Sequence, residues 1–523
     1  MIMIDDMPRK HAKLSPNKEC MVFEQYRFTW RELDERVNRL ANGLVSMGLK
    51  RGSHIAILAQ NSHRYMEYYY ALARAGMVTV PLNWRLSNEE MLYVLDHSES
   101  VAFLVGEEYI ETVKALRPNL PRIRHYISID GPVEEMKDYE TLLSESSPAP
   151  HEGPHDEDAM FMLMYTGGTT GLPKGVMISN RNLMTATLGC ILSLRNSADK
   201  DEEMSTLMIL PMFHIAIWPI LAVHYVGGKA VINKRFDLVY VLETLQRERV
   251  AHMNMVPTIA AFMLQFGNLE KYDLSSLRGL TYAGSPMPFE VLMKLKEQFP
   301  KLDFGQGYGL TEASPLVSML DDKDHRRTET EKDRKRLTSA GREGLTVEAR
   351  VVNENDKDVK PGEIGEIIAR GKNIMLGYWK NPELTAQTLR GGWLHTGDMA
   401  TVDEDGYIYI VDRKNDMIIT GGENVYPREV EDVIFKHPAV LECAVVGAPD
   451  KVWGESIKAV VALKPGTTAT EEEIIALCKK HLAGYKKPKS VDFVDALPKT
   501  PIGKIMRRKV KEKYWEGRDK KIG

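Results

Sequence analysis

Cysteines are few in this sequence of 523 residues, and their positions give them no shared role. Cys20, Cys190, Cys443 and Cys478 lie far apart, and no two of them form a CxxC pair. This spacing implies no metal site, and it predicts reduced thiols in a cytoplasmic protein.

An excess of charge of either sign is also missing. The chain has 69 Lys and Arg against 73 Asp and Glu, which gives a formal net charge of -4. This balance does not favour a nucleic-acid partner. With 43% hydrophobic and 27% charged residues, a chain of this length predicts a folded, soluble protein with two or more domains.

No segment has the features of a signal peptide or of a membrane span. The stretch from Met1 to Pro16 contains acidic residues and no long apolar run. Leu207 to Val226 approaches transmembrane length, but Pro211 and Pro219 interrupt it and no cluster of basic residues flanks it. We therefore expect a buried stretch that lines a cavity.

The two standard phosphate-binding patterns are absent, although the stretch MYTGGTTGLPKGV (Met164–Val176) offers backbone N–H groups, hydroxyls and Lys174 to an anion. Pro173 stands where a Walker loop has glycine, and the three-glycine dinucleotide pattern is missing. Taken alone, the stretch leaves two alternatives: a phosphate loop of another kind, or a turn between two strands.

Strand-like apolar runs alternate with helical patterns through the first half of the chain. A capping box begins at Thr29, a buried strand is expected at 54–59, and a helix capped by Asp237 is expected to reach Val250. This alternation predicts an α/β domain with a mainly parallel sheet. The mixed charges of Asp321–Arg336 predict a solvated surface loop.

The pattern of apolar and polar residues changes in the second half of the chain. Residues 340–412 contain short strands joined by polar turns, which predicts a β-rich subdomain. Residues 413–523 combine helical and strand patterns and predict a small α+β domain behind a linker. The expected division is thus a large N-terminal domain, 1–412, and a small C-terminal domain, 413–523.

Two motifs have residues suited to a nucleotide. In Gly305–Pro315 (GQGYGLTEASP), glycines on both sides of Tyr308 let a flat ring approach the backbone, while Thr311 and Glu312 suit a phosphate and its magnesium ion. In GGWLHTGDMA, Asp398 can accept both hydroxyls of a ribose. The alternatives are a strand-ending turn and an Asx-turn.

Two further motifs lie near the C-terminus. DRKNDMIITGGENVYPREVE (Asp412–Glu431) spans the expected domain border. PKTPIGKIMRRK (Pro498–Lys509) places Lys504 after a glycine in a Pro/Gly loop, with an exposed basic tail as the alternative.

Together, and in this order, these motifs resemble those of the acyl- and aryl-CoA synthetases, relatives of luciferases and of peptide-synthetase adenylation domains. The resemblance extends from about Phe28 to Arg508. It implies an AMP-forming ligase that uses ATP, Mg²⁺ and CoA: a carboxylic acid becomes an acyl-adenylate, and the CoA thiol then displaces AMP. It also implies that the C-terminal domain rotates between the two steps.

The resemblance assigns residue roles motif by motif. Nucleotide-binding roles fall to Thr166, Gly167, Gly168, Thr169, Thr170, Gly171, Lys174, Ala283, Gly284, Ser285, Gln306, Gly307, Tyr308, Asp398 and Arg413. The residues expected at the reacting groups are Lys504, Thr311, Glu312 as the metal ligand, and His214 as the gate to the thiol tunnel. The residues expected to contact CoA are Gly421, Gly422, Glu423, Trp453, Tyr485 and Lys487. The acid pocket is expected to include His214, Ile215, Trp218, Gly309 and Leu310.

Three features depart from the pattern of relatives: two single positions, and the charged Asp321–Arg336 stretch, which matches no functional motif. Gly167 replaces a frequent Ser, and Asn415 occupies the hinge position, where Asp or Lys is usual. Gly309 stands where acetate-specific relatives have Trp, so the resemblance implies an open pocket floor and an acid larger than acetate: fatty, cyclic or aromatic. On this interpretation, Gly309→Trp shifts preference toward acetate.

The sequence is also compatible with other functions. One is an adenylation enzyme that loads a carrier protein, although it would have no use for Trp453, Tyr485 and Lys487. Another is a non-enzymatic nucleotide-binding relative, and the spacing around Lys174 disfavours a P-loop switch. The sequence fixes neither the acid, nor the direction of the reaction in the cell, nor the oligomeric state, with a homodimer among the options.

Overall fold

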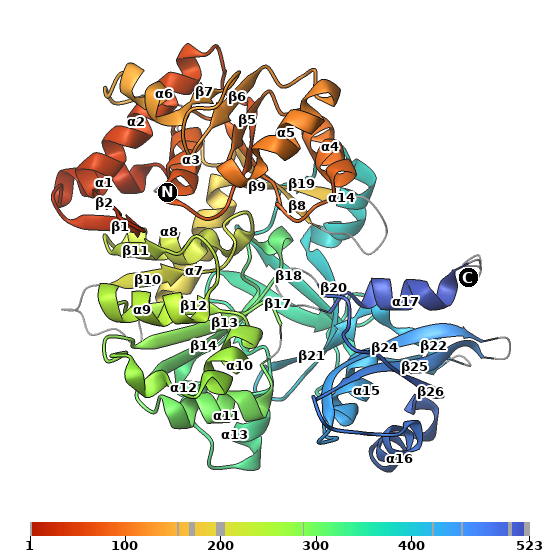
Figure 1. The fold of residues 1–523 in the computed structure, drawn as a ribbon. Coiled ribbons are helices and arrows are strands. Elements are labelled where there is room, and N and C mark those ends of the chain that lie inside the picture. The colour runs from red at the N-terminus through yellow and green to blue at the C-terminus, as the bar shows by residue number, and fades with distance from the viewer. Residues whose placement is uncertain are drawn as a thin grey trace. The chain divides into compact units, whose positions relative to one another are not determined.

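The computed structural model describes residues 3–153, 156–166, 173–194, 204–285, 287–420, 423–450, 453–499 and 505–516 (Figure 1). Contacts divide the chain into two compact units. The first unit contains Met1–Ala349 and Ile368–His395; the second contains Arg350–Ile367 and Thr396–Gly523. Residues 396–412 thus group with the C-terminal part of the chain. The predicted boundary at 412/413 concerns a different property, namely where the mobile C-terminal domain begins, and it stays a prediction.

A nine-stranded sheet in the first unit carries much of the predicted site. Its order is β16-β15-β14-β13-β12-β10-β11-β1-β2, and all neighbours from β14 to β1 are parallel. The strands are β1 (Glu19–Phe23), β2 (Tyr26–Thr29), β10 (Ser205–Met208), β11 (Lys229–Ile232), β12 (His252–Met255), β13 (Gly279–Ala283), β14 (Asp303–Tyr308), β15 (Ser318–Leu320) and β16 (Arg342–Glu343). Parallel strands need helical crossovers, and α9 (Leu238–Glu248), α10 (Pro257–Phe266) and α11 (Phe289–Gln298) lead to β12, β13 and β14, respectively.

An eight-stranded sheet forms the other layer of the first unit. Its order is β19-β9-β8-β4-β3-β5-β6-β7. The strands are β3 (His54–Leu58), β4 (Val78–Pro81), β5 (Ala102–Val105), β6 (His125–Ser128), β7 (Lys137–Asp138), β8 (Met160–Thr166), β9 (Lys174–Ser179) and β19 (Gly377–Tyr378). Buried aliphatic residues of β3, β4 and β5 pack with α4 (Asn88–His97) and α5 (Ile110–Leu116) into one core. The predicted capping box is present: Glu32 N–H donates to the Thr29 hydroxyl at the start of α2 (Trp30–Ser46).

The β-rich region predicted from residue 340 forms a four-stranded sheet of order β17-β18-β20-β21. Its strands are β17 (Val347–Val352), β18 (Gly365–Gly371), β20 (Leu394–Val402) and β21 (Ile408–Arg413). The prediction of a mixed α/β protein with mainly parallel sheets and a β-rich part is therefore confirmed.

The C-terminal part of the second unit is an α+β fold, as predicted. Its strands are β22 (Ile418–Thr420), β23 (Glu423–Val425), β24 (Val440–Asp450), β25 (Gly454–Leu463) and β26 (Ser490–Phe493), in the order β23-β22-β25-β24 with β26 beside β25. Helices α15 (Pro427–Ile434) and α16 (Glu471–His481) pack on this sheet around a core of buried aliphatic residues. Helix α17 (Arg507–Trp515) follows the segment that carries Lys504.

The segment Asp321–Arg336 is mostly exposed to solvent, as expected, but the expectation that it is a loop is wrong. The segment forms α12 (Asp322–Arg326) and α13 (Glu331–Arg336), and Asp324 and His325 are buried. His325 Nδ1 lies 2.8 Å from the carbonyl oxygen of Asp321, and its Nε2 lies 2.9 Å from the Tyr282 hydroxyl on β13. The local charge pattern could not reveal this contact, because Tyr282 is far away in the sequence.

The apolar stretch Leu207–Val226 is not one helix. It is divided among the end of β10, a short 3-10 turn at Ile215–Ile217 and α8 (Trp218–Tyr225). Within the part of the chain that the structure describes, no helix is both long and apolar enough to cross a membrane.

Candidate active site

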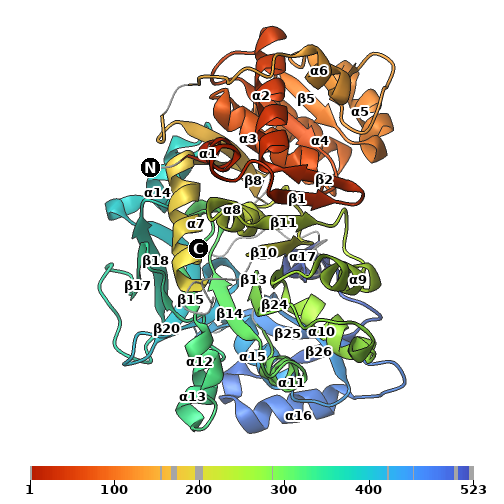
Figure 2. The same ribbon diagram turned by 90° about the vertical axis from the view of Figure 1, so that its left-hand side faces the viewer.

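The carboxyl ends of β13 and β14 bring two predicted nucleotide-binding segments together. Tyr282 pairs with Gln306 and Ala283 pairs with Gly307, so the Ala283–Ser285 segment emerges beside Gly307 and Tyr308. The two strands are neighbours in both views of the fold (Figures 1 and 2). Ligands of open α/β sheets bind at this edge. Gly284 has a φ of +85°, which lets the chain turn sharply after β13.

The backbone of β14 is open on one face. A Cβ added at Gly305 would meet its nearest neighbour, Thr281 Oγ1, at 3.6 Å, and one added at Gly307 would meet Ala283 Cβ at 3.9 Å. Both are ordinary van der Waals distances, so neither glycine is required by crowding. Their missing side chains leave room for a flat group against the strand.

Gly309 is different, and its expected role as an opening in the pocket floor is wrong. A Cβ at Gly309 would overlap the carbonyl oxygen of Pro315 and lie 2.6 Å from the carbonyl carbon. The chain closes on itself here, since Val317 N–H donates to the carbonyl oxygen of Tyr308 at 2.9 Å. Glycine is therefore needed for close backbone approach, and Gly309→Trp would disrupt the loop rather than fill a pocket.

Thr311 and Glu312 lie in that closed loop, in a 3-10 turn at Thr311–Ala313. The Tyr378 hydroxyl donates to Glu312 Oε1 at 2.8 Å, and Met375 N–H donates to the Glu312 carbonyl oxygen at 2.9 Å. Burial and the negative charge of Glu312 raise the pKa of Tyr378, so the phenol stays protonated and remains a donor. Sequence reasoning missed Tyr378, because only the pairing of β19 with β9 brings it to Glu312.

The hairpin of β8 and β9 presents Lys174 to the same tyrosine. Thr166 pairs with Lys174 at the end of the hairpin, and the Lys174 ammonium lies 5.9 Å from the centre of the Tyr378 ring. A cation at this distance from an aromatic face is attracted to it. The predicted residues Gly167, Gly168, Thr169, Thr170 and Gly171 lie outside the described residues.

The donor set around Glu312 fits magnesium of the type bound with a nucleotide. Among the described residues, no group of three or more His, Cys, Asp or Glu side chains could hold a metal ion. Mg²⁺ in nucleotide enzymes does not need such a group, because one or two carboxylates bind it together with substrate phosphates and water. Glu312, beside Thr311 and at the nucleotide edge, can serve as that carboxylate.

The predicted acid-pocket residues lie after β10 and beside the same loop. His214 follows β10, and its ring centre is 4.4 Å from that of Phe213. Burial, and then the positive charge of Arg85, lower the pKa of His214 to about 4, so the imidazole is neutral at pH 7. Trp218, at the start of α8, packs against a buried apolar cluster that includes Leu316 and Met319. Ile215 lies in the 3-10 turn between His214 and Trp218. Leu310 directly precedes Thr311.

The second unit pairs the predicted ribose ligand with Arg413. Asp398 on β20 is the strand partner of Arg413 at the end of β21, and the Arg413 Nε lies 3.4 Å from Asp398 Oδ1. Asn415 lies in the short turn Lys414–Asp416, directly after this pair.

The predicted CoA-contacting side chains of the second unit are mostly exposed. Trp453 and Tyr485 are 54% and 46% exposed, Glu423 is exposed on β23, and Lys487 is partly buried at the end of a 3-10 turn. Large exposed aromatic side chains of this kind are suited to stacking with a ligand. Gly421, Gly422 and Lys504 lie outside the described residues.

An ion cluster around Arg507 was not predicted. Its guanidinium lies 3.1 Å from Asp412 and from Asp416, and 2.7 Å from Glu431. Glu431 is buried, and desolvation raises its pKa in spite of Arg507. The cluster joins α17 to both sides of the segment around Asn415.

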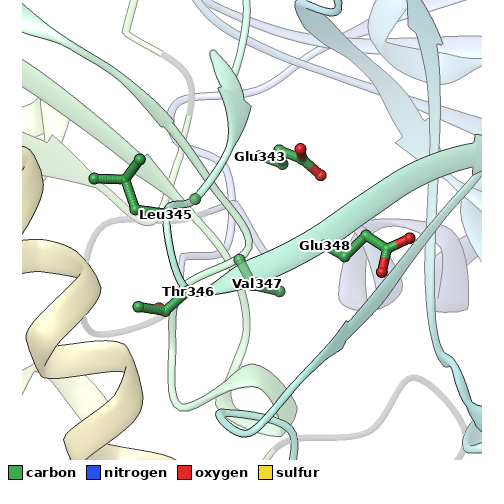
Figure 3. A pocket seen from close by; sticks show the side chains of 6 residues that line it. Glu343, Leu345, Thr346, Val347 and Glu348 are labelled. Carbon is green, nitrogen blue, oxygen red and sulfur yellow. The ribbon is translucent and has the colours of Figure 1, made fainter.

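An open hollow of about 490 Å³ lies over Glu343–Glu348, between β16 and β17 (Figure 3). It contains none of the predicted substrate-binding residues. Both of its carboxylates have partners: Glu343 accepts a hydrogen bond from Ala349 N–H, and Glu348 pairs with Arg370 at 2.6 Å. We therefore do not assign it to the reaction.

Comparison with known proteins gives one consistent family. The family model described as AMP-binding enzyme matches residues 8–379, and that of the AMP-binding enzyme C-terminal domain matches 429–504. The chain is 38% identical over 510 residues to a feruloyl-CoA synthase of Amycolatopsis sp, covering 97% of this chain and 98% of that protein. It is 31% identical over 513 residues to the fatty acid–[acyl-carrier-protein] ligase ScoC of Streptomyces coeruleorubidus, covering 98% and 96%.

A solved structure of a relative has the same fold. The crystal structure of the anthranilate CoA ligase AuaEII in complex with anthranoyl-AMP superposes with a TM-score of 0.86 at 27% identity, covering 98% of this chain and 97% of that one. The chain therefore belongs to the AMP-binding enzyme family, and it is an ATP-dependent acid–thiol ligase of the adenylate-forming type.

Proposed function

We propose that the protein is an AMP-forming acyl-CoA synthetase for a monocarboxylic acid larger than acetate. The observation that carries the proposal is the contact chain Lys174–Tyr378–Glu312 at the edge where β13 and β14 end. This contact chain supports the proposal, because Lys174 and Glu312 both contact Tyr378 and Glu312 closely follows the segment expected to hold adenine. The feruloyl and anthranilate relatives favour an aromatic acid within the wider range of acids.

In the first half-reaction, the substrate carboxylate attacks the α-phosphorus of ATP and pyrophosphate leaves. Both reactants are anions, so catalysis depends on screening their repulsion. Lys174 and Lys504 supply positive charge, and Thr311 contacts the α-phosphate. Glu312 would hold a magnesium ion, which would supply further positive charge against the phosphates. One opposite charge at about 4 Å is worth about 4 kcal/mol at an effective dielectric of about 20.

In the second half-reaction, the CoA thiol attacks the acyl carbonyl and AMP leaves. Rotation at Asn415 takes Lys504 away and brings Gly421, Gly422 and Glu423 to the active site. Trp453 and Tyr485 bind the CoA nucleotide through their exposed rings. His214, neutral at pH 7, opens the thiol path without placing a positive charge in the acid pocket.

The acid should be bound mainly by burial of apolar surface. Trp218 and the residues around it contribute an apolar wall. Each additional buried CH₂ should contribute roughly 0.8 kcal/mol until the pocket is full. Affinity should therefore rise from acetate toward longer aliphatic and aromatic acids.

The test is carboxylate-dependent exchange of pyrophosphate into ATP across a panel of acids, followed by thioester formation on free CoA. The proposal expects both activities, with acetate among the poorest acids. Absence of exchange with every acid would indicate a binding-only relative, and acetate as the best acid would contradict the proposed substrate class.

Loading of a carrier protein is the second candidate, because the relative ScoC is named as a ligase of that kind. The two candidates share the first half-reaction and differ in the acceptor thiol. Parallel assays with CoA and with a phosphopantetheinylated carrier protein separate them. Acyl transfer to the carrier without transfer to free CoA would favour the second candidate.

A further inference from the structure

The main chain at Tyr378 is fixed from two sides. On one side, β19 pairs with β9, so that Tyr378 lies opposite Val176 and Gly377 lies opposite Met177. On the other, Tyr378 N–H donates to Thr385 Oγ1 at 2.9 Å. The side chain is 7% exposed. A phenol held in this way has few alternative positions for its hydroxyl group.

That hydroxyl group is directed at Glu312. The distance of 2.8 Å from Tyr378 Oη to Glu312 Oε1 is that of a good hydrogen bond. Three residues earlier, Met375 N–H binds the main-chain carbonyl of the same glutamate at 2.9 Å. The segment Met375–Tyr378 therefore holds Glu312 by both its main chain and its side chain.

The residues directly before that segment, Lys372–Ile374, are tied to the loop that carries Glu312 and to α7 (Asn180–Leu194). Asn373 Nδ2 donates to the carbonyl oxygens of Ala313 at 2.8 Å and Leu316 at 2.7 Å. Asn182 Nδ2 in turn donates to the carbonyl oxygens of Lys372 and Ile374 at 2.8 and 2.7 Å. The loop that carries Glu312 is thus supported along its length, and Tyr378 is the member of this support that reaches the carboxylate.

We propose that Tyr378 is a positioning residue that fixes the Glu312 carboxylate for the magnesium ion of bound ATP. It binds one carboxylate oxygen and so sets the direction of the other. Because its ring also faces Lys174, it fixes the carboxylate relative to the cation at the turn end of the β8–β9 hairpin. The inference rests on the proposed function, in which Glu312 is the metal ligand.

The experiment compares Tyr378→Phe with Tyr139→Phe. Tyr139 is a matched control, because its hydroxyl donates to a buried glutamate, Glu67, at 2.7 Å outside this site. The probe is Mn²⁺ titrated into protein with α,β-methylene-ATP, without acid or CoA, and free Mn²⁺ is measured by electron paramagnetic resonance. Groups that orient a metal ligand typically contribute 10- to 100-fold to metal affinity. Tyr378→Phe should weaken Mn²⁺ binding by about 10-fold or more, and Tyr139→Phe should leave it unchanged.

Two further variants separate a failure of the inference from a failure of the proposed metal site. Glu312→Gln should weaken Mn²⁺ binding, and Tyr378→Phe should add little in that background, since the hydroxyl acts through Glu312. Unchanged affinity in Tyr378→Phe, with weaker binding in Glu312→Gln, overturns the inference alone. Unchanged affinity in Glu312→Gln overturns the proposed metal ligand and the inference with it. Equal weakening by Tyr378→Phe and Tyr139→Phe would show a general loss of stability and also overturns the inference.

Discussion

Replacing Gly309 by alanine should disable adenylation with every acid. The added Cβ would overlap the Pro315 carbonyl group, with the carbonyl carbon at 2.6 Å, whereas real Cβ atoms essentially never approach another heavy atom within 3.0 Å. The obstacle is backbone, so no side-chain rotation removes it. The neighbouring loop is also held by Asn373 at Ala313 and Leu316, which limits how the strain can be relieved.

The size of the effect follows from the displacement. Relieving the overlap requires the chain around Gly309 or Pro315 to move by about 1 Å or more, and a misplacement of about 1 Å in an active site can cost about 100-fold in rate. Because Thr311 and Glu312 lie in this loop, the loss should appear in pyrophosphate exchange. Its magnitude should be similar for small and large acids.

Gly305→Ala is the matched control. It adds the same methyl group to the adjoining strand, where the nearest atom is Thr281 Oγ1 at 3.6 Å. Exchange and thermal stability should be measured for both variants with acetate, a medium-chain acid and an aromatic acid. Gly305→Ala should retain its thermal stability, because the added methyl group meets only ordinary van der Waals distances, and it should lose much less exchange activity than Gly309→Ala. If Gly309→Ala keeps normal exchange and only shifts preference toward smaller acids, then Gly309 does line the pocket floor and the packing argument is refuted.

Three further predictions concern other parts of the protein. Lys504→Ala should lower adenylate formation by orders of magnitude but largely spare thioester formation from a supplied acyl-adenylate; equal losses in the two assays would contradict the assigned role. Arg507→Gln should lower the free energy of unfolding of the second unit by about 3 kcal/mol, because it leaves Glu431 and Asp412 without their counter-charge; urea unfolding should show partial recovery when Glu431→Gln is added, and no recovery would refute the pairing. His214 takes up a proton near pH 4 when folded but near pH 6.5 when unfolded, so its contribution to stability should be lost as the pH falls between these values. His214→Asn should make unfolding less sensitive to pH in that window, and an unchanged pH dependence would show that the imidazole is not desolvated.

The sequence by itself determined the class of protein and the order of the motifs that carry its chemistry. Local patterns were sufficient for the capping box at Thr29, for the strand from His54 and for the helix capped by Asp237, because each depends on neighbours within a few residues. The motif order also predicted the family, since a phosphate loop, a GYGLTE segment and a C-terminal lysine loop rarely occur together by chance. Both family models agree with that prediction.

Only the tertiary structure decided what each of these residues contacts. Tyr378 meets Glu312, 66 residues away, because β19 adds to the edge of β9, and Arg507 meets Asp412, 95 residues away. The sequence pattern placed His325 in a solvated segment, whereas in the folded chain His325 is buried and contacts Tyr282. Gly309 looked like an opening because a sequence reports that a side chain is missing, not what occupies its space. Contacts between distant segments depend on strand order and close packing, and these are properties of the folded chain as a whole.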